Sequence, residues 1–264
     1  MISLFPSRAV ALNLFGFEIH WYGLLYLAGF LIAAWLLPRL QKYRGLSLSR
    51  DEWFVLLEWS IVGVIVGGRL GYVLFYELPY FLDHPLQIFT VWKGGMSFHG
   101  GFLGALAVIV WFARRRRMSL LRLGDTVVVP VAIGLALGRL GNFINQELYG
   151  TVTMLPWGMQ FPGAEGLRHP TQLYAIAKDL LIAGLCFWHL RHRPKLAGRT
   201  AALFLILYGI GRFLVEFFRE QQYAYTVLLG FGFTRGQLLT IPVFLVGIFI
   251  WLLLSNRPNR RQKV

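Results

Sequence analysis

Long apolar blocks, separated by short polar segments, are the main feature of the sequence. A transmembrane helix needs about 20 mostly apolar residues, and seven blocks are close to this length. The pattern predicts an all-α, polytopic membrane protein with a single integral-membrane domain over residues 1–264. We expect the transmembrane helices at Ile19–Leu37, Trp53–Tyr76, Ser97–Ala113, Thr126–Ile144, Thr171–Leu190, Thr200–Phe218 and Gln237–Leu254.

Basic residues concentrate in alternate connections between these blocks. Cytoplasmic loops of membrane proteins contain an excess of Lys and Arg. The connections after the first, third, fifth and seventh blocks are the basic ones, so we expect all four on the cytoplasmic side. The N-terminus is then outside and the C-terminus is cytoplasmic. The basic segments are "PRLQKYRGLSLSR", Arg114–Arg117 with Arg122, "RHRPK" with Arg199, and "NRPNRRQK".

The opposite connections are richer in Gly, Pro and aromatic residues. We expect them to be periplasmic loops, at about residues 78–96, 145–170 and 219–236. Tyr and Trp are enriched at membrane–water interfaces. The aromatic residues that fit such a belt are Tyr76, Tyr80, Trp92, Trp157, Tyr223 and Tyr225.

Composition excludes several classes of protein. Charged residues make up 14% of the chain, against about 25% in an ordinary soluble domain. The net charge of +14 does not indicate nucleic-acid binding, because the basic residues lie in short loops where topology places them. The N-terminus lacks the ordered features of a cleaved signal peptide.

Cysteine and histidine usage argues against metal and disulfide chemistry. Cys186 is the single cysteine, so a disulfide within the chain and a cysteine metal cluster are both excluded. The six histidines are scattered, and neither an HExxH nor a GxSxG motif is present. We expect no metal and no cofactor, and any reacting thiol would come from a partner.

Polar side chains nevertheless gather at the predicted outer end of several spans. Arg139 and Asn142 are three residues apart and share a helical face, and Glu147 follows just past the end of their span. Ionisable residues inside a membrane are costly and are functional by default.

The sixth span has a similar polar stripe. Tyr208, Arg212 and Glu216 are spaced by four and lie on one face of an otherwise apolar helix. Arg219 and Glu220 continue the stripe towards the interface.

The first three spans contribute further polar groups at similar depth. His99 lies near the outer end of the third span, where a helix N-terminus and Gly100 would suit an anion. Arg69 lies in the second span and Tyr26 in the first.

Each feature also has a structural interpretation. Arg212 and Glu216 could pair to fix two helices, and His99 could be a satisfied interfacial histidine. Glycines beside Arg69 favour close helix packing, and the tyrosines could belong to the aromatic belt. Independent helix contacts would not favour one leaflet, so the convergence favours a functional site. The glycines are Gly63, Gly67, Gly68 and Gly71.

The chemistry that suits these residues is phosphate binding. Arginine can hold a phosphate bidentately, and the predicted depth matches a phospholipid head group in the outer leaflet. The residues favour a transferase that positions a lipid and activates a second substrate, with a histidine as the candidate base.

Two longer strings resemble the signatures of the prolipoprotein diacylglyceryl transferase family. They are "HGGFLG" at His99–Gly104 and "GRLGNFINQELYG" at Gly138–Gly150. The resemblance extends in order over nearly the whole chain, and the further similar strings are "GLLYLAGF", "GGRLGYVLFY", "HPTQLYA" and "LYGIGRFLVEFFRE".

The resemblance implies a reaction and a location. The diacylglyceryl group of phosphatidylglycerol would move to the thiol of the lipobox cysteine in a prolipoprotein signal peptide, and glycerol 1-phosphate would leave. This is the first step of bacterial lipoprotein maturation. The protein would lie among the lipids of the bacterial inner membrane, with its active site towards the periplasmic face.

The resemblance also implies roles for individual residues. Arg139 and Arg212 would hold the phosphate and stabilise its leaving charge. His99 would deprotonate the thiol or orient the head group, although an arginine-rich field could by itself lower the pKa of the thiol. Asn142 and Glu147 would orient the lipid glycerol or the arginines, and Glu216 would fix Arg212. Tyr26 would line the lipid cavity or hydrogen-bond the phosphate. The other residues expected in the substrate site are Arg69, Gly150 and Tyr208.

Two other function classes remain open. A transporter or flippase would need a polar path to the cytoplasmic face, for which Asp125, Glu58 and the Lys178–Asp179 pair are candidates. A non-catalytic lipid-binding scaffold predicts that His99 can be replaced without loss of function. If the thiol belongs to the partner, Cys186→Ala should retain activity.

Overall fold

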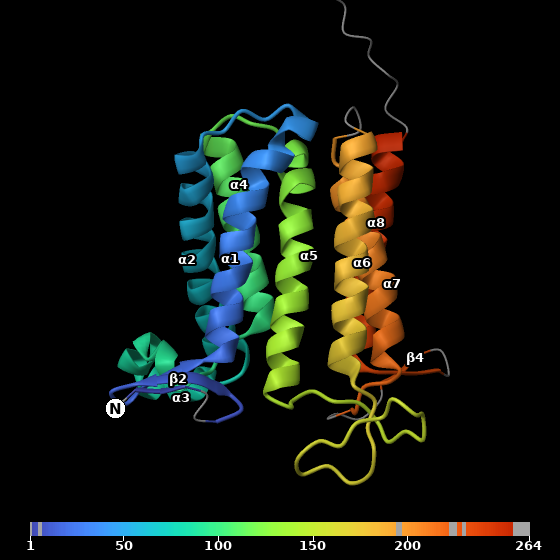
Figure 1. Ribbon diagram of the computed structural model, residues 1–264. Helices are drawn as coiled ribbons and strands as arrows, with labels where there is room; N and C mark the ends of the chain where they lie inside the picture. The colour runs from blue at the N-terminus through green and yellow to red at the C-terminus, as the bar shows by residue number, and fades with distance from the viewer. Residues whose placement is uncertain (1, 5–6, 194–196, 222–225, 229–230, 256–264) are drawn as a thin grey trace, which may run out of the picture. The chain divides into compact units, whose positions relative to one another are not determined.

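The structure is a computed structural model of the 264-residue chain that describes residues 2–4, 7–193, 197–221, 226–228 and 231–255. It divides into two compact units. Figure 1 labels the helices and strands and colours the chain by residue number. Unit 1 contains Met1–Leu36 and Asp125–Val264, and unit 2 contains Leu37–Gly124. Both unit boundaries fall inside long helices, so neither is an exposed linker. A single catalytic domain, as expected from the sequence, stays a prediction.

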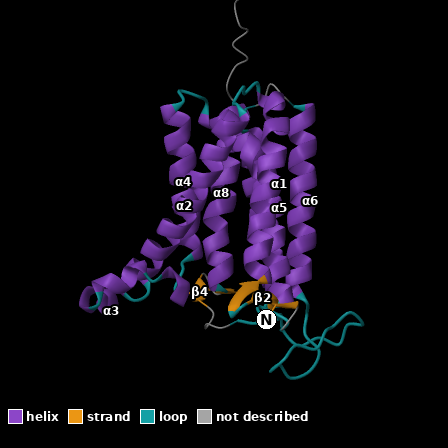
Figure 2. Cartoon of the chain, turned by 60° about the vertical axis from the view of Figure 1, so that its left-hand side comes forward, coloured by secondary structure: helices purple, strands orange, loops and turns teal. Residues whose placement is uncertain are grey.

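Seven helices of 18 or more residues are present in the described part of the chain, within six residues of the expected positions (Figure 2). They are α1 (Trp21–Leu40), α2 (Arg50–Phe75), α4 (Phe98–Arg115), α5 (Leu120–Ile144), α6 (Thr171–His192), α7 (Arg199–Glu216) and α8 (Arg235–Ser255).

Five of these helices are long and apolar enough to cross a membrane, namely α1, α2, α5, α6 and α8. The helices α4 and α7 are each 18 residues long and contain charged residues. In α7 these are Arg199, Arg212 and Glu216. The expected polytopic character is therefore confirmed, while membrane spanning by α4 and α7 needs a separate argument.

The prediction of an all-α fold was wrong in detail, because two small antiparallel sheets are also present. One contains β1 (Ile2–Leu4), β2 (Val10–Leu14) and β3 (Phe17–His20) in that order, and the other contains β4 (Thr226–Leu228) and β5 (Phe231–Phe233). In Figure 2 the strands lie at the end of the unit 1 helices where the 145–170 connection is found.

A tight turn forms the β2–β3 hairpin. Phe15 and Gly16 both have positive φ, 52° and 98°, and Asn13 Oδ1 accepts a hydrogen bond from the Gly16 amide at 3.0 Å. Two positive φ values at adjacent positions match the two-residue hairpin turn that suits the strand twist. The available signal was the large apolar residues Val10, Leu12 and Leu14 at every second position, but this segment is far shorter than a 20-residue apolar block.

Close contact between α2 and α4 forms the core of unit 2. A Cβ on Gly67 would lie 2.9 Å from the Gly104 Cα, and a Cβ on Gly71 would lie 2.8 Å from the Gly100 Cα. The backbones can approach this closely only without side chains. The packing role expected for these glycines is confirmed.

A capping box begins α2 three residues before the predicted start. Ser49 accepts a hydrogen bond from the Glu52 amide at 3.2 Å, and the Glu52 carboxylate accepts one from the Ser49 amide at 2.8 Å. Each side chain satisfies an amide that the helix leaves unpaired. The "SRDE" string therefore fixes the start of α2 better than the apolar pattern did.

In unit 1, helices α6, α7 and α8 pack against one another. Gly209 of α7 faces Phe244, whose Cβ lies 2.8 Å from where a glycine Cβ would be. Asp125 of α5 accepts hydrogen bonds from the amides of Gly198 and Ala201, both at 2.7 Å. This fully buried carboxylate thus caps the start of α7. These hydrogen bonds give Asp125 a structural role, so its burial in the helices does not require a transport path.

The expected aromatic belt is exposed where it is described. Tyr76, Tyr80, Trp92 and Trp157 are all exposed. Tyr223, Tyr225, the Pro194–Lys195 part of "RHRPK" and the "NRPNRRQK" segment lie outside the described residues.

Candidate active site

A chain of polar contacts connects the last turns of α5 with the turn after this helix. Arg139 Nη1 donates to Asn142 Oδ1 at 3.3 Å, and Asn142 Nδ2 donates to Glu147 Oε1 at 2.8 Å. The first contact follows from the helical spacing of three residues, whereas the second needs the turn after the helix. Gln146 and Leu148 adopt positive φ in this turn, 61° and 59°. The structure therefore brings together three of the residues expected in the site.

A second polar cluster ends α7. Arg212 forms an ion pair with Glu216, as the spacing of four residues predicted. Glu216 is buried, and its carboxylate also accepts hydrogen bonds from Arg219 at 3.4 Å and from Thr234 at 3.2 Å. A buried carboxylate is stable only with such partners. Glu216 therefore fixes both arginines.

Gly150 connects these two clusters. It forms an isolated β-bridge with Arg219, and its amide donates to the His169 carbonyl at 2.9 Å. A Cβ on Gly150 would collide with the Phe218 carbonyl and lie 2.7 Å from Thr171 Cγ2. Only glycine permits this close approach. Gly150 thus places the Arg219 segment beside the end of α5.

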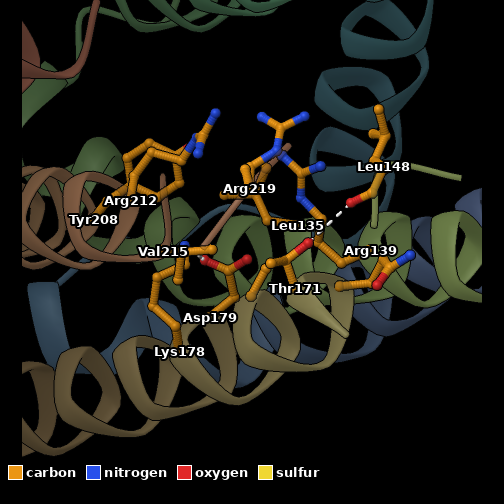
Figure 3. A pocket seen from close by; sticks show the side chains of 12 residues that line it. Leu135, Arg139, Leu148, Thr171, Lys178, Asp179, Tyr208, Arg212, Val215 and Arg219 are labelled. Atoms are coloured by element: carbon orange, nitrogen blue, oxygen red, sulfur yellow. Dashed lines mark hydrogen bonds and ion pairs between the residues drawn. The ribbon is translucent and has the colours of Figure 1, made fainter. Parts of the chain in front are cut away.

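A pocket opens among α5, α6 and α7 (Figure 3). Four basic side chains line it, against the single carboxylate of Asp179. This excess of positive charge in a partly buried space suits an anionic group. The lining residues are Leu135, Arg139, Leu148, Thr171, Gln172, Ala175, Lys178, Asp179, Tyr208, Arg212, Val215 and Arg219.

Arg219 is the lining cation that lies beyond the end of α7. Burial lowers the pKa of its guanidinium from the usual value, and the nearby Arg212 acts in the same direction, while Glu216 opposes them. Burial and a like charge both disfavour the charged form. An anion in the pocket would relieve this repulsion.

Three of the lining residues were not predicted to belong to the site. Gln172 is buried, and its Nε2 donates to the Glu147 carbonyl at 2.7 Å. Lys178 forms an ion pair with Asp179. The signal for this pair was two adjacent charges within an apolar span, which the sequence assigned only to a transport path.

Two tyrosines of α1 lie close to the α5 cluster. The hydroxyls of Tyr22 and Tyr26 are 3.5 Å apart, and the Tyr22 ring packs where a Cβ on Gly141 would be. Tyr22 also interacts electrostatically with Arg139 and Glu147. Tyr26 is exposed at 47% and is absent from the pocket lining, so its expected contact with lipid stays a prediction.

His99 and Arg69 belong to unit 2. His99 is exposed on the first turn of α4, with its ring edge-on to Phe98 at 5.7 Å between centroids. Ser97 caps this helix by accepting a hydrogen bond from the Gly100 amide at 3.3 Å. An exposed imidazole at this position is accessible to a reacting partner, and its role as base stays a prediction.

The Arg69 guanidinium is buried and holds the connection between α2 and α4. It donates to the carbonyls of Gln87 at 2.5 Å, Ile88 at 2.8 Å and Gly94 at 2.7 Å. Phe81 covers the guanidinium at 5.0 Å. These bonds occupy the donors of Arg69, so they give no support to the predicted contact with substrate.

Metal ligation has no visible basis in the described part of the chain, where no group of three His, Cys, Asp or Glu residues is placed to hold an ion. The arrangement in unit 1 is instead one of guanidinium and ammonium groups held in place by carboxylates and amides. Such groups bind an anion and stabilise negative charge that develops on it.

Comparison with known proteins gives one consistent result. Residues 9–253 match the family model described as prolipoprotein diacylglyceryl transferase. A Geobacter sulfurreducens protein is 46% identical over 241 residues, which cover 91% of this chain and 92% of that protein. A Pseudomonas entomophila protein is 45% identical over 265 residues, covering 97% of each chain. Both are named phosphatidylglycerol–prolipoprotein diacylglyceryl transferase.

Proposed function

The chain belongs to the prolipoprotein diacylglyceryl transferase family and is a transferase, and from this premise we propose its reaction. It moves the diacylglyceryl group of phosphatidylglycerol onto the thiol of the lipobox cysteine of a prolipoprotein and releases glycerol 1-phosphate. This is the first step of bacterial lipoprotein maturation. The names of the relatives supply the two substrates. The resemblance of the motifs supplies the lipobox cysteine as acceptor, glycerol 1-phosphate as product and the place in lipoprotein maturation.

The observation that best supports this proposal is the basic pocket of unit 1. Arg139, Arg212 and Arg219 reach it from α5, α7 and the segment after α7. The phosphate of phosphatidylglycerol is the part of the lipid that needs such groups. Arginine offers paired N–H donors that match the oxygens of a phosphate.

The proposed topology has seven transmembrane helices in the bacterial inner membrane. It adds α4 and α7 to the five helices that are apolar enough to span. The charges within α7 are acceptable there because Arg212 and Glu216 pair with each other and lie in the pocket or the core. By the positive-inside rule the N-terminus and the pocket end of unit 1 face the periplasm.

The reaction is a substitution at carbon. The cysteine sulfur attacks the glycerol carbon that bears the phosphate ester, so a C–S bond forms and the C–O bond breaks. The electron pair of that bond stays on the phosphate oxygen, and the thiol proton passes to a base. The ester bonds of the two acyl chains take no part. The three pocket arginines stabilise the leaving phosphate, a contribution on the order of 10²–10³-fold for a single donor in other enzymes.

The supporting residues keep these cations in place. Asn142 and Glu147 orient Arg139 through the hydrogen bonds described above, and Glu216 orients Arg212. Gly150 permits the close backbone contact that positions Arg219. Tyr208 lines the deeper part of the pocket, and Tyr26 contacts the lipid from α1.

Two groups are candidates for activating the thiol. A free cysteine has a pKa of about 8.5, so little thiolate exists at neutral pH. His99 is the candidate base, and a positioned base contributes on the order of 10²–10⁴-fold. The alternative is that the arginine field lowers the pKa of the thiol without a base.

Transfer of labelled glycerolipid from phosphatidylglycerol to a lipobox peptide tests the proposal directly. Purified wild type in detergent should modify the peptide, and Arg139→Ala should lose nearly all transfer while remaining folded. Arg168→Ala is a matched control, because Arg168 pairs with the exposed Glu220 and is absent from the pocket lining. Absence of transfer by folded wild type that still binds lipid would reject the proposal in favour of a transporter or scaffold.

The variant His99→Gln distinguishes the two routes to the thiolate. If His99 is the base, the rate at neutral pH falls by at least tenfold and recovers as the pH approaches the pKa of the free thiol. If the arginine field suffices, the variant keeps the wild-type rate and pH profile.

A further inference from the structure

The Lys178–Asp179 pair lies in the basic pocket but has no part in the proposed phosphate chemistry. Both residues line the pocket from α6, and their side chains are 12% and 3% exposed. Their carboxylate and ammonium groups form an ion pair. Each also interacts electrostatically with Arg139 and Arg212. The pair is therefore an integral part of the pocket.

The surroundings of Lys178 fix the direction of its side chain. Its Cδ and Cγ lie 2.5 and 2.7 Å from where a Cβ on Gly211 would be, so the aliphatic stem fills the space left by that glycine on α7. Its ammonium lies 4.5 Å from the centre of the Tyr208 ring. The packing of the Lys178 stem, the Tyr208 ring and the Asp179 carboxylate together hold the ammonium beside Tyr208, at the depth of that residue in the pocket (Figure 3).

The Lys178 ammonium and Tyr208 lie at the inner end of the pocket. The outer end is lined by Leu148 and by Thr171 on the first turn of α6, whereas Lys178 lies about two turns further along that helix. On α7, Tyr208 is about one turn, or ~6 Å, deeper than Arg212. The ammonium therefore lies about one turn beyond the proposed phosphate contacts, on the side towards the centre of the helices.

A phospholipid that enters the pocket with its phosphate at the arginines would place a particular group here. Its two ester carbonyls lie one glycerol backbone away from the phosphate, towards the acyl chains. That separation is of the same order as one helical turn, ~5.4 Å. An ester carbonyl accepts hydrogen bonds but has no charge, which suits an ammonium whose charge is already balanced by Asp179.

We propose that the Lys178 ammonium, held by Asp179 and Tyr208, donates a hydrogen bond to an acyl ester carbonyl of the diacylglyceryl group and makes the enzyme select diester over diether lipids. This inference rests on the proposed function. It goes beyond that function because it assigns a determinant for the part of the lipid that is transferred. An ammonium has three donors, and Asp179 does not use them all.

The experiment compares phosphatidylglycerol with its dialkyl ether analogue in the lipobox-peptide assay. The analogue keeps the head group, the phosphate and the reacting carbon, and it lacks only the two carbonyls. Wild type should prefer the diester by about tenfold in kcat/KM, since a site that hydrogen-bonds a substrate group discriminates against an analogue without it. This preference corresponds to about 1.4 kcal/mol.

The double variant Lys178→Met with Asp179→Asn removes the ammonium without leaving a buried carboxylate unpaired. Its rate on the diester should fall by about tenfold, while its rate on the diether should stay near that of wild type. The selectivity ratio should then be close to one. A structural role would instead lower the rates on both lipids equally and leave the ratio unchanged.

A second variant keeps both charges and moves the ammonium. Gly211→Ala places a methyl group where the Lys178 stem lies, so it should also reduce the diester preference. Thr200→Val is the matched control, because it removes the 2.9 Å hydrogen bond between Thr200 on α7 and His189 on α6, both outside the pocket lining. Its selectivity ratio should equal that of wild type.

The outcomes separate this inference from the proposed function. Equal use of the two lipids by wild type, or an unchanged ratio in the double variant, overturns the role of Lys178 while the transferase reaction stands. Failure of wild type to use either lipid overturns the proposed function itself.

Discussion

Arginines inside predicted spans have opposite tasks in the two units. In unit 2, the buried Arg69 donates to backbone carbonyls of the connection that follows its own helix. In unit 1, among the described residues, Arg139 donates to the amide oxygen of Asn142 and Arg212 pairs with the carboxylate of Glu216, and both arginines line a pocket. An intramembrane arginine is thus no sufficient sign of a site, because its partners decide whether donors remain for a ligand.

Glycines differ between the units in a similar way. The glycines of α2 and α4 allow two backbones to touch, whereas Gly211 of α7 makes room for the stem of Lys178. The first use fixes a helix pair, and the second shapes a pocket. The same residue type therefore serves packing in unit 2 and a side chain of the candidate site in unit 1.

Of the substitutions that test this comparison, the largest change in activity is expected from one in the pocket of unit 1. Arg212→Ala should lower transfer on the order of 10²–10³-fold, because it removes a donor to the leaving phosphate. The measurement is the initial rate of lipid transfer to a lipobox peptide. Arg212→Lys should recover part of the rate, since it restores the charge but not the paired donors. A wild-type rate in Arg212→Ala would contradict the assignment of the phosphate site.

Arg69→Ala should act on stability. It leaves the partly buried carbonyls of Gln87 and Ile88 and the carbonyl of Gly94 without their donor, at a cost of about 1–3 kcal/mol. Thermal unfolding in detergent should begin at a lower temperature, and protease should cleave more readily within residues 84–96. If the variant keeps its stability but loses transfer, Arg69 contacts the substrate after all and the contrast between the units fails.

The glycine contacts of unit 2 predict a smaller change. Gly67→Ala places a Cβ 2.9 Å from the Gly104 Cα, and the overpacking should cost about 1–3 kcal/mol. Gly134→Ala is the matched control, because a Cβ there meets nothing within 4 Å. That control should be neutral or stabilise the helix by up to about 1 kcal/mol. Equal unfolding temperatures for both variants would show that the α2–α4 contact is loose.

The smallest effect on transfer is expected from substitution of Cys186. Cys186 is fully buried in unit 1, and its sulfur lies 4.0 Å from the Thr200 carbonyl. Cys186→Ala should keep the wild-type rate of transfer and lose about 1 kcal/mol of stability from the small cavity. A folded but inactive variant would show that this enzyme supplies a thiol of its own.

Local patterns predicted most of the helices, since the thickness of a bilayer sets how long an apolar block must be. The Arg212–Glu216 pair was equally predictable, because residues four apart on a helix are neighbours whatever surrounds them. The β2–β3 hairpin was missed although its signal was local. Its alternating residues were too few to stand out beside seven apolar blocks.

The sequence by itself determined the helices, the glycine stripes, the family and the polar residues at one end of the spans. Only the tertiary structure decided what each polar group bonds to. Asp125 caps a helix that begins 74 residues later in the chain, and Lys178 extends into a gap at Gly211. The physical reason is that a buried polar group must find a partner, and packing decides which partners lie within reach.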